Sequence, residues 1–185
     1  MDVKEAIQER RAYRSFEPVD ITREIVGELA EAARLAPSCN NNQPWRFVFA
    51  YDKEVLGRLH EALPEGNRWV KSASMIIAVF SRREDDCVIK DREYNLFDTG
   101  LAVGQMLLRA TELGLVAHPI AGYNPVKVRE VLGIPDAYQV ITLINVGRHS
   151  SMVPDYFSDN QKLGEKQRPP RKPAGEIAYT DGYKV

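Results

Sequence analysis

Apolar residues recur along this chain in two patterns, and each pattern predicts one kind of element. Recurrence every three or four residues predicts helices, whereas short continuous runs rich in branched and aromatic residues predict strands. The predicted helices are Val3–Arg10, Thr22–Leu35, Lys53–Leu63, Glu93–Gly114 and Val126–Leu132, and the predicted strands are Phe47–Ala50, Met75–Phe80, Val116–Ala121 and Val140–Val146.

The longest predicted helix, Glu93–Gly114, is unusual because it carries no charge between Asp98 and Arg109. Apolar side chains cover almost its whole circumference, which is typical of a helix that is buried on all sides. A chain of 185 residues has little material with which to surround such a helix. We therefore expect it to pack against a second subunit. A central helix covered by its own chain is the alternative.

Composition and charge argue against several classes of function. The chain is 44% hydrophobic and 28% charged, and its net charge of −1 gives no overall field that attracts nucleic acid or an anionic membrane. No apolar run reaches the length that spans a bilayer. The two cysteines form no CxxC and show no ligand spacing, so we expect the protein in a reducing cytoplasm. The three histidines are scattered, so we expect no metal site.

The segment Ala36–Trp45, with the sequence APSCNNNQPW, is the most informative part of the chain. Its hydroxyl, thiol and amide side chains are uncharged. Amides and hydroxyls both donate and accept hydrogen bonds, so this segment can line the rim of a flat heteroaromatic ligand. A solvated turn between a helix and a strand is the alternative, because asparagine is a common turn former.

Two basic clusters lie far apart in the sequence. Each one alone fits a solvated face. Together they can hold a phosphate, which favours bidentate arginine and the point charge of lysine. A Walker-type phosphate loop and a GxGxxG turn after a strand are both missing from the sequence. The clusters are Arg10, Arg11 and Arg14, and Lys162, Lys166, Arg168, Arg171 and Lys172.

Taken in order, these segments resemble the FMN-dependent nitroreductase family. The resemblance implies an α+β fold in which helices flank a central, mainly antiparallel sheet, with a long buried central helix and an extended C-terminal arm. It also implies a homodimer with FMN at the subunit interface, in which 1–149 form the FMN-binding core and 150–185 form an arm that wraps the partner. The motifs are RRAYRSF from Arg10, APSCNNNQPW from Ala36, DTGLAVGQMLLRATELGL from Asp98, HPIAGY from His118, VGR from Val146 and KQR from Lys166.

The resemblance also implies a set of cofactor-binding residues. Basic positions after the first helix and a K-x-R pair contact the phosphate end of FMN. The amide-rich loop within Ala36–Trp45 reaches a flavin that is bound mainly by the other subunit. An asparagine lies near the pyrimidine side of the ring, and a turn presents a backbone N–H to flavin N5. The residues are Arg10, Arg11, Ala12 and Arg14, then Pro37, Ser38, Cys39, Asn41 and Gln43, then Asn67, then Pro119, Ile120, Ala121 and Gly122, and finally Lys166 and Arg168.

Two positions depart from the family pattern. Ala12 stands where the family usually has serine, so one hydroxyl that would contact the phosphate is missing. Ala121 stands where some members have glutamate, so only a backbone contact with the cofactor is left at this position. His118 lies beside the turn, and we expect it to be structural. We expect no side chain to act as a catalytic acid or base, because flavin N5 carries the chemistry.

The function implied by the resemblance is an FMN-dependent oxidoreductase. It would transfer electrons from NADH or NADPH to a small acceptor by a ping-pong mechanism. Nitroaromatics, quinones, flavins and activated alkenes are the candidate acceptors. A non-catalytic FMN carrier or sensor is one alternative, and a specialised flavin oxidase or dehydrogenase is another.

Overall fold

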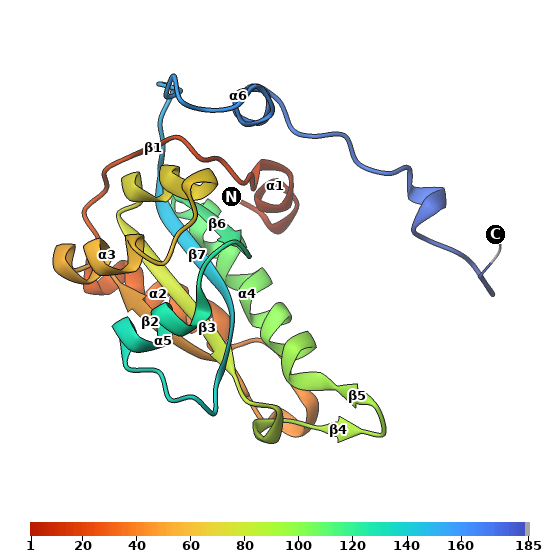
Figure 1. The fold of residues 1–185 in the computed structure, drawn as a ribbon. Coiled ribbons are helices and arrows are strands. Elements are labelled where there is room, and N and C mark those ends of the chain that lie inside the picture. The colour runs from red at the N-terminus through yellow and green to blue at the C-terminus, as the bar shows by residue number, and fades with distance from the viewer. Residues whose placement is uncertain (184–185) are drawn as a thin grey trace.

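An antiparallel sheet forms the centre of the fold, and helices cover both of its faces (Figure 1). The structure is a computed structural model that describes residues 1–183. Strand β7 is the organising strand, because it pairs with β3, with β6 and, at its end, with β1, while β2 adds to the other side of β3. The strands of this sheet are β1 Phe16–Glu17, β2 Arg46–Ala50, β3 Met75–Ser81, β6 Val116–Ile120 and β7 Gln139–His149.

The continuous apolar run of strand β3 is explained by burial on both faces of the sheet. Side chains alternate between the two faces of a strand, and both faces of this sheet are covered. Ile76 and Ala78 join the cluster formed with α3 and α5, whereas Met75 and Ile77 join the cluster formed with α2 and α4. All residues of β3 are buried. The covering helices are α2 Arg23–Arg34, α3 Lys53–His60, α4 Tyr94–Glu112 and α5 Pro125–Leu132.

Helix α4 is the predicted long helix, but its own chain covers only one of its faces. Ala102, Met106 and Ala110 recur at helical spacing and are fully buried against the sheet and α2. Outside that face Leu96 is 42% and Phe97 is 61% exposed. Contiguous exposed apolar side chains of this kind usually mark an interaction surface.

Several predicted ends coincide with caps in the structure. Thr22 caps α2 by accepting a hydrogen bond from the backbone N–H of Ile25, and Asn124 caps α5, which has Pro125 in its first turn. Helix α1, Val3–Glu9, ends at Arg10 as expected. Helix α3 is shorter than predicted, and strand β7 is longer.

The C-terminal segment differs from its predicted extended form, because it contains helix α6, Asp159–Lys166. This helix lacks an apolar face. A capping box between Ser158 and Gln161 starts it, and its buried residue is the charged Glu165. The hydrophobic pattern therefore gave no signal for it. The apolar group Ile177–Tyr179 follows the short 3-10 helix η4, Ala174–Glu176, and is exposed.

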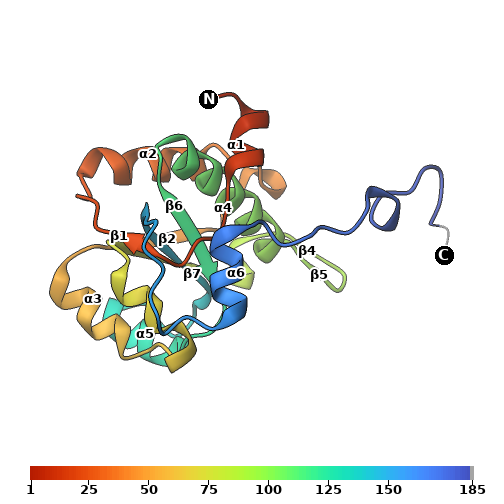
Figure 2. The same cartoon turned by 90° about the horizontal axis from the view of Figure 1, so that it is seen from above.

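Beyond α6 the chain leaves the body of the protein. Every residue from 169 to 183 is exposed, and Figures 1 and 2 both show this arm running outward from the remaining fold. Over residues 1–183, no helix combines the length and the hydropathy needed to cross a membrane.

Candidate functional site

A basic cavity lies between the end of α1 and the end of α6. Its volume is about 260 Å³, and both basic clusters of the sequence contribute to it. Pairing of β1 with the end of β7 brings the two chain segments together, because α1 precedes β1 and α6 follows β7. The residues that line the cavity are Arg10, Arg11, Ala12, Arg14, Gly164, Arg168, Pro169 and Arg171.

Two arginines hold the walls of this cavity together. The Arg11 guanidinium donates to the carbonyl of Gly164 at 2.7 Å and to the hydroxyl of Tyr13 at 2.9 Å, and it lies over the Tyr13 ring. The Arg168 guanidinium donates to the carbonyl of Arg10 at 2.8 Å and to that of Gln8. These contacts make Arg11 and Arg168 structural clamps as well as sources of positive charge.

Arg10 and Arg14 are different, because their guanidinium groups make no hydrogen bond or ion pair with any residue in the range 1–183. Burial and the neighbouring guanidinium groups of Arg168 and Arg171 lower the pKa of Arg10. A lowered arginine pKa signals positive charge that the protein does not neutralise. Guanidinium groups in this arrangement can receive an anion with several acceptor oxygens.

A turn at the end of β6 is fixed through its carbonyl groups. Asn145 donates to the carbonyl of His118 at 3.0 Å, and Asn67 donates to the carbonyl of Gly122 at 2.8 Å. A Cβ atom at Gly122 would lie 2.8 Å from the Asn67 amide nitrogen, so a larger residue here would displace the Asn67 amide from this hydrogen bond. Ala121 and Gly122 are exposed. The structure thus joins two separately predicted site segments, Asn67 and the turn.

His118 is buried in strand β6, just before the turn. It is 6% exposed, and its Nδ1 lies 2.8 Å from the carbonyl oxygen of Tyr13, so Nδ1 carries a proton and donates it. Burial lowers the pKa of His118 to about 4, which keeps the ring neutral at physiological pH. Its ring packs 4.7 Å from that of Trp69. These contacts fit the structural role expected of His118.

The amide loop, residues 38–43, has an unusual backbone. Asn40, Asn41 and Gln43 all have positive φ angles, and the 3-10 turn η1, Cys39–Asn41, lies within the loop. The hydroxyl of Ser38 accepts from the backbone N–H of Gln43 at 3.0 Å. Asn41 is exposed, so its amide is available to a ligand or to a second chain.

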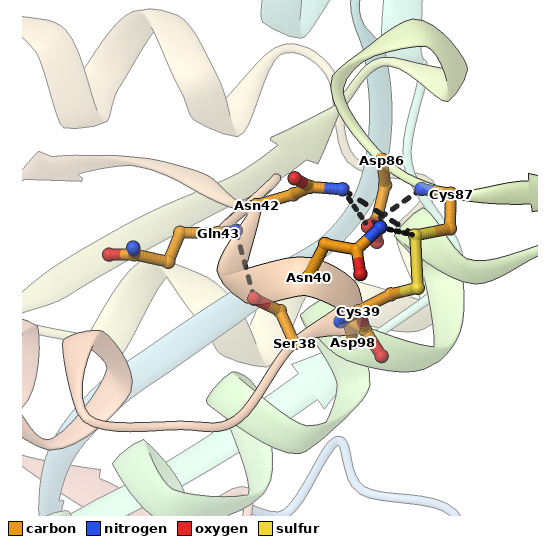
Figure 3. The surroundings of a disulfide bond; sticks show 8 residues. All are labelled: Ser38, Cys39, Asn40, Asn42, Gln43, Asp86, Cys87 and Asp98. Atoms are coloured by element: carbon orange, nitrogen blue, oxygen red, sulfur yellow. Dashed lines mark hydrogen bonds between the residues drawn. A yellow bond between two sulfur atoms is a disulfide. The ribbon is translucent and has the colours of Figure 1, made fainter.

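Cys39 and Cys87, which show no CxxC or ligand spacing in the sequence, form a disulfide bond (Figure 3). The two residues are 48 positions apart, and only the tertiary fold brings them together. The segment that contains Cys87 forms the 3-10 helix η3, Arg83–Asp85, and the hairpin of β4, Val88–Ile89, with β5, Arg92–Glu93.

Within one chain the amide loop and the basic cavity lie at opposite ends of the body. In Figure 1, α1 and α6 are at the top, while the orange loop lies beside the β4–β5 hairpin at the bottom. A groove of about 660 Å³ runs between them along the uncovered face of α4. It is lined by Pro37 at the start of the loop, by α4 residues from Gly100 to Leu108, and by Arg10.

The family profile described as "Nitroreductase family" matches residues 7–69 and 63–148 of the chain. The chain belongs to the nitroreductase family. It is 30% identical over 152 residues to a provisionally named NADH dehydrogenase/NAD(P)H nitroreductase of Methanothermobacter thermautotrophicus, covering 80% of this chain and 77% of the relative. It is 27% identical over 164 residues to the oxygen-insensitive NADPH nitroreductase of Helicobacter pylori, covering 70% and 78%.

A solved structure described as an oxidoreductase containing FMN matches with a TM-score of 0.82 and 30% identity. The match covers 100% of this chain and 94% of that chain. The predicted family and the predicted α+β fold are therefore confirmed, and the chain is an oxidoreductase of the nitroreductase type.

Some predicted site residues take other positions, and some site residues were missed. Lys166 is exposed in the last turn of α6 and does not line the basic cavity, whereas Arg171 lines it and was named only as part of a basic cluster. Glu165 was missed. Its buried carboxylate accepts from the backbone N–H of Arg14 at 2.7 Å and from the hydroxyl of Ser15. A lone acid within a basic segment was the available signal in the sequence.

Proposed function

We propose that this nitroreductase-family protein is an FMN-dependent oxidoreductase that works as a homodimer. In this proposal the basic cavity binds the FMN phosphate, and the turn at the end of β6 lies against the ring. The amide loop of the partner chain completes the site. The residues assigned to these roles are those that the sequence pattern indicated, with Arg171 added to the phosphate cavity and Lys166 placed at its margin.

The observation that carries the proposal is the charge in the basic cavity. Arg10 and Arg14 present guanidinium groups with no partner among residues 1–183, and Arg168 and Arg171 add further charge. Ala12 offers no hydroxyl there, so arginines supply the recognition. Planar guanidinium groups bind phosphate oxygens in pairs, which gives both affinity and orientation.

The homodimer follows from the surfaces that one chain leaves uncovered. The groove along α4 contains Gly100 and Gly104, and a Cβ atom at either glycine would meet nothing within 4 Å. A second backbone can therefore approach this helix closely. The arm of residues 169–183 is exposed along its whole length and is long enough to lie on a partner.

A dimer also resolves the separation between the two halves of the site. The amide loop and the basic cavity of one chain lie at opposite ends, so a cofactor that contacts both must draw on two chains. The relative whose solved structure contains FMN covers the whole of this chain, including the arm. That correspondence supports FMN as the ligand.

Bound FMN would accept electrons from NADH or NADPH and pass them on to a small acceptor in a ping-pong cycle, with N5 as the reacting atom. The chain's own contribution is charge and position. Arg14 stands near the indole of Trp69, 5.8 Å from the ring centroid, and would stabilise negative charge on a ring held at the turn. Nitroaromatics, quinones, flavins and activated alkenes remain the proposed acceptors, and the cytoplasm the proposed location.

One experiment distinguishes a reductase from an FMN carrier or sensor. The FMN-loaded protein is mixed anaerobically with NADH or NADPH, and flavin absorbance is followed. The proposal predicts complete bleaching within seconds with one of the donors, and recovery of colour on addition of a quinone. A flavin that stays oxidised with both donors would instead favour the carrier or sensor, or an oxidase with another substrate.

A further inference from the structure

The disulfide between Cys39 and Cys87 ties the amide loop to the segment between η3 and β4 (Figure 3). The two Cα atoms are 6.0 Å apart. Cys39 lies inside the loop that the proposed function assigns to the partner's cofactor, but that function gives the bond no role. The chemistry of these two sulfur atoms is therefore separate from the proposed electron transfer.

The loop needs an external constraint because its backbone is unfavourable. Asn40, Asn41 and Gln43 have φ angles of 50°, 59° and 51°, in the left-handed region. Residues with a Cβ atom seldom adopt this region, although asparagine tolerates it better than most. A segment with three such residues keeps its shape only while its surroundings hold it.

The constraint has a polar part and a covalent part. The backbone N–H of Cys39 donates to the Asp98 carboxylate at 2.6 Å, and the Asn42 amide donates to the Asp86 carboxylate at 3.2 Å. The disulfide is the covalent part. It joins the loop to the same short segment that Asp86 belongs to, so cleavage of the S–S bond leaves that connection to hydrogen bonds alone.

The two sulfur atoms have different surroundings. The side-chain amides of Asn40 and Asn42 donate toward Cys87 Sγ at 3.4 and 3.6 Å. Donors of this kind stabilise a thiolate, and the sulfur that is the more stable thiolate is the better leaving group. Both cysteines are partly exposed, so a small thiol can reach them. The Asp86 carboxylate lies within 4.8 Å of both sulfur atoms and opposes a thiolate on either one, so the amide donors are what distinguish the two. They direct attack to Cys39, with Cys87 as the leaving sulfur.

We propose that Cys39 and Cys87 are a thiol–disulfide exchange site at which a low-molecular-weight thiol releases the amide loop and the disulfide form of that thiol locks it again. A thiolate from the first thiol attacks Cys39 Sγ, the S–S bond breaks, and Cys87 leaves as a thiolate. A second thiol then displaces Cys39 from the mixed disulfide. Two external thiols are oxidised to one disulfide, and the protein pair gains two electrons and the two thiol protons.

The proposed cytoplasmic location agrees with this assignment. Disulfides in a reducing cytoplasm are usually transient, catalytic or redox-sensing. An oxidoreductase that draws on NADH or NADPH fits that compartment, so a permanent structural bridge is the less natural role. The effect on the cofactor rests on the proposed function, whereas the exchange reaction itself does not.

The experiment compares the full-length protein in reduced glutathione with the same protein in oxidised glutathione. Alkylation and mass measurement count the free thiols in each state. Amide hydrogen exchange then follows residues 38–43, with helix α5 as an internal reference, and titration gives the dissociation constant of FMN. The double variant Cys39→Ser/Cys87→Ser is the control that glutathione cannot change.

The proposal predicts two free thiols in reduced glutathione and none in oxidised glutathione. On reduction, exchange in residues 38–43 rises at least about fivefold and the FMN dissociation constant rises at least about fivefold, the lower range of allosteric coupling. The double variant should match the reduced protein in both buffers.

Two results overturn the proposal: a pair that stays oxidised in reduced glutathione, or loop exchange that ignores the state of the pair. Faster loop exchange with unchanged FMN affinity overturns the effect on the cofactor and leaves the exchange site supported. Absence of FMN binding in both states has a different meaning. It overturns the proposed function, and thiol counts with loop exchange then decide the exchange site alone. If the double variant fails to fold, the comparison of the unaltered protein in reduced and oxidised glutathione still decides whether the pair is an exchange site.

Discussion

The backbone N–H of Arg14 donates a 2.7 Å hydrogen bond to the carboxylate of Glu165, a residue 151 positions further along the chain. This bond fastens helix α6 to the segment that follows α1. Glu165 is 6% exposed, and its second oxygen accepts from Ser15 and lies 3.3 Å from His149 Nε2. A buried acid therefore positions the two halves of the basic cavity.

Glu165→Ala should destabilise the protein, because it leaves buried donors on Arg14 and Ser15 without an acceptor. Hydrogen bonds to a charged group contribute about 1.5–3 kcal/mol each, so we expect the free energy of unfolding to fall by about 3 kcal/mol. Glu165→Gln keeps one acceptor oxygen in place and should lose about 1 kcal/mol. Urea unfolding of both variants measures this. Equal stability of the two variants would contradict the role of Glu165 as an acceptor.

Arg10→Ala and Arg168→Ala should each weaken FMN binding, because both remove positive charge from the basic cavity. The loss of one charge-assisted contact predicts a dissociation constant about 10–100-fold higher. Titration with FMN and with riboflavin measures it. Riboflavin lacks the phosphate, so its affinity should stay the same.

The matched control for these two variants is Arg58→Ala. Arg58 is an exposed arginine in the last turn of α3, outside the cavity. This control should bind FMN like the unaltered protein. If Arg10→Ala and Arg168→Ala weaken FMN and riboflavin equally, the phosphate assignment is wrong.

The fold could be read from the sequence where neighbouring residues alone determine the element. Strand β3 is buried on both faces, so every residue from Met75 to Phe80 is apolar. Helix α4 shows its buried face through Ala102, Met106 and Ala110. The site was predictable in its separate segments, because arginines, amides and a Pro-Ile-Ala-Gly turn each carry their own chemistry.

The contacts between these segments could not be read in the same way. Glu165 looks like any surface acid until Arg14 and Ser15 are brought to it. Cys39 and Cys87 have no local spacing, because their pairing depends on how the amide loop meets the segment after η3. Helix α6 was missed because its ends are set by polar caps and it lacks an apolar stripe.

His118 gives a pH dependence with a defined sign. Burial lowers its pKa in the folded protein to about 4, below the usual value of about 6.5, so the unfolded chain binds a proton over a range in which the folded protein does not. The contribution of neutral His118 to the free energy of unfolding is complete above pH 6.5 and is lost as the pH falls toward 4. Its full size is about 3 kcal/mol.

His118→Asn removes this titration while keeping an amide donor for the carbonyl of Tyr13. We expect the unaltered protein to lose about 2–3 kcal/mol more than the variant between pH 7 and pH 4.5. Urea unfolding at the two pH values measures the difference, and other titrating groups cancel because both proteins share them. An identical pH dependence would show that His118 does not stay neutral in the fold.

Gly104→Leu tests the second face of α4. A side chain at Gly104 meets nothing within its own chain, so the folded monomer should tolerate it. Between two closely packed helices the same side chain overfills the interface, and we expect the dimer dissociation constant to rise about 10-fold or more. Sedimentation at several concentrations measures it. Gly57→Leu on α3, which also has open space, is the control and should leave the assembly unchanged.

The central claim is that two chains together hold FMN through the arginines of the basic cavity. Light scattering coupled to size-exclusion chromatography, with flavin absorbance recorded on the same peak, tests it most directly. The account predicts a particle of two 20.9 kDa chains carrying one FMN per chain. A single 20.9 kDa chain that elutes without flavin after incubation with excess FMN would contradict it.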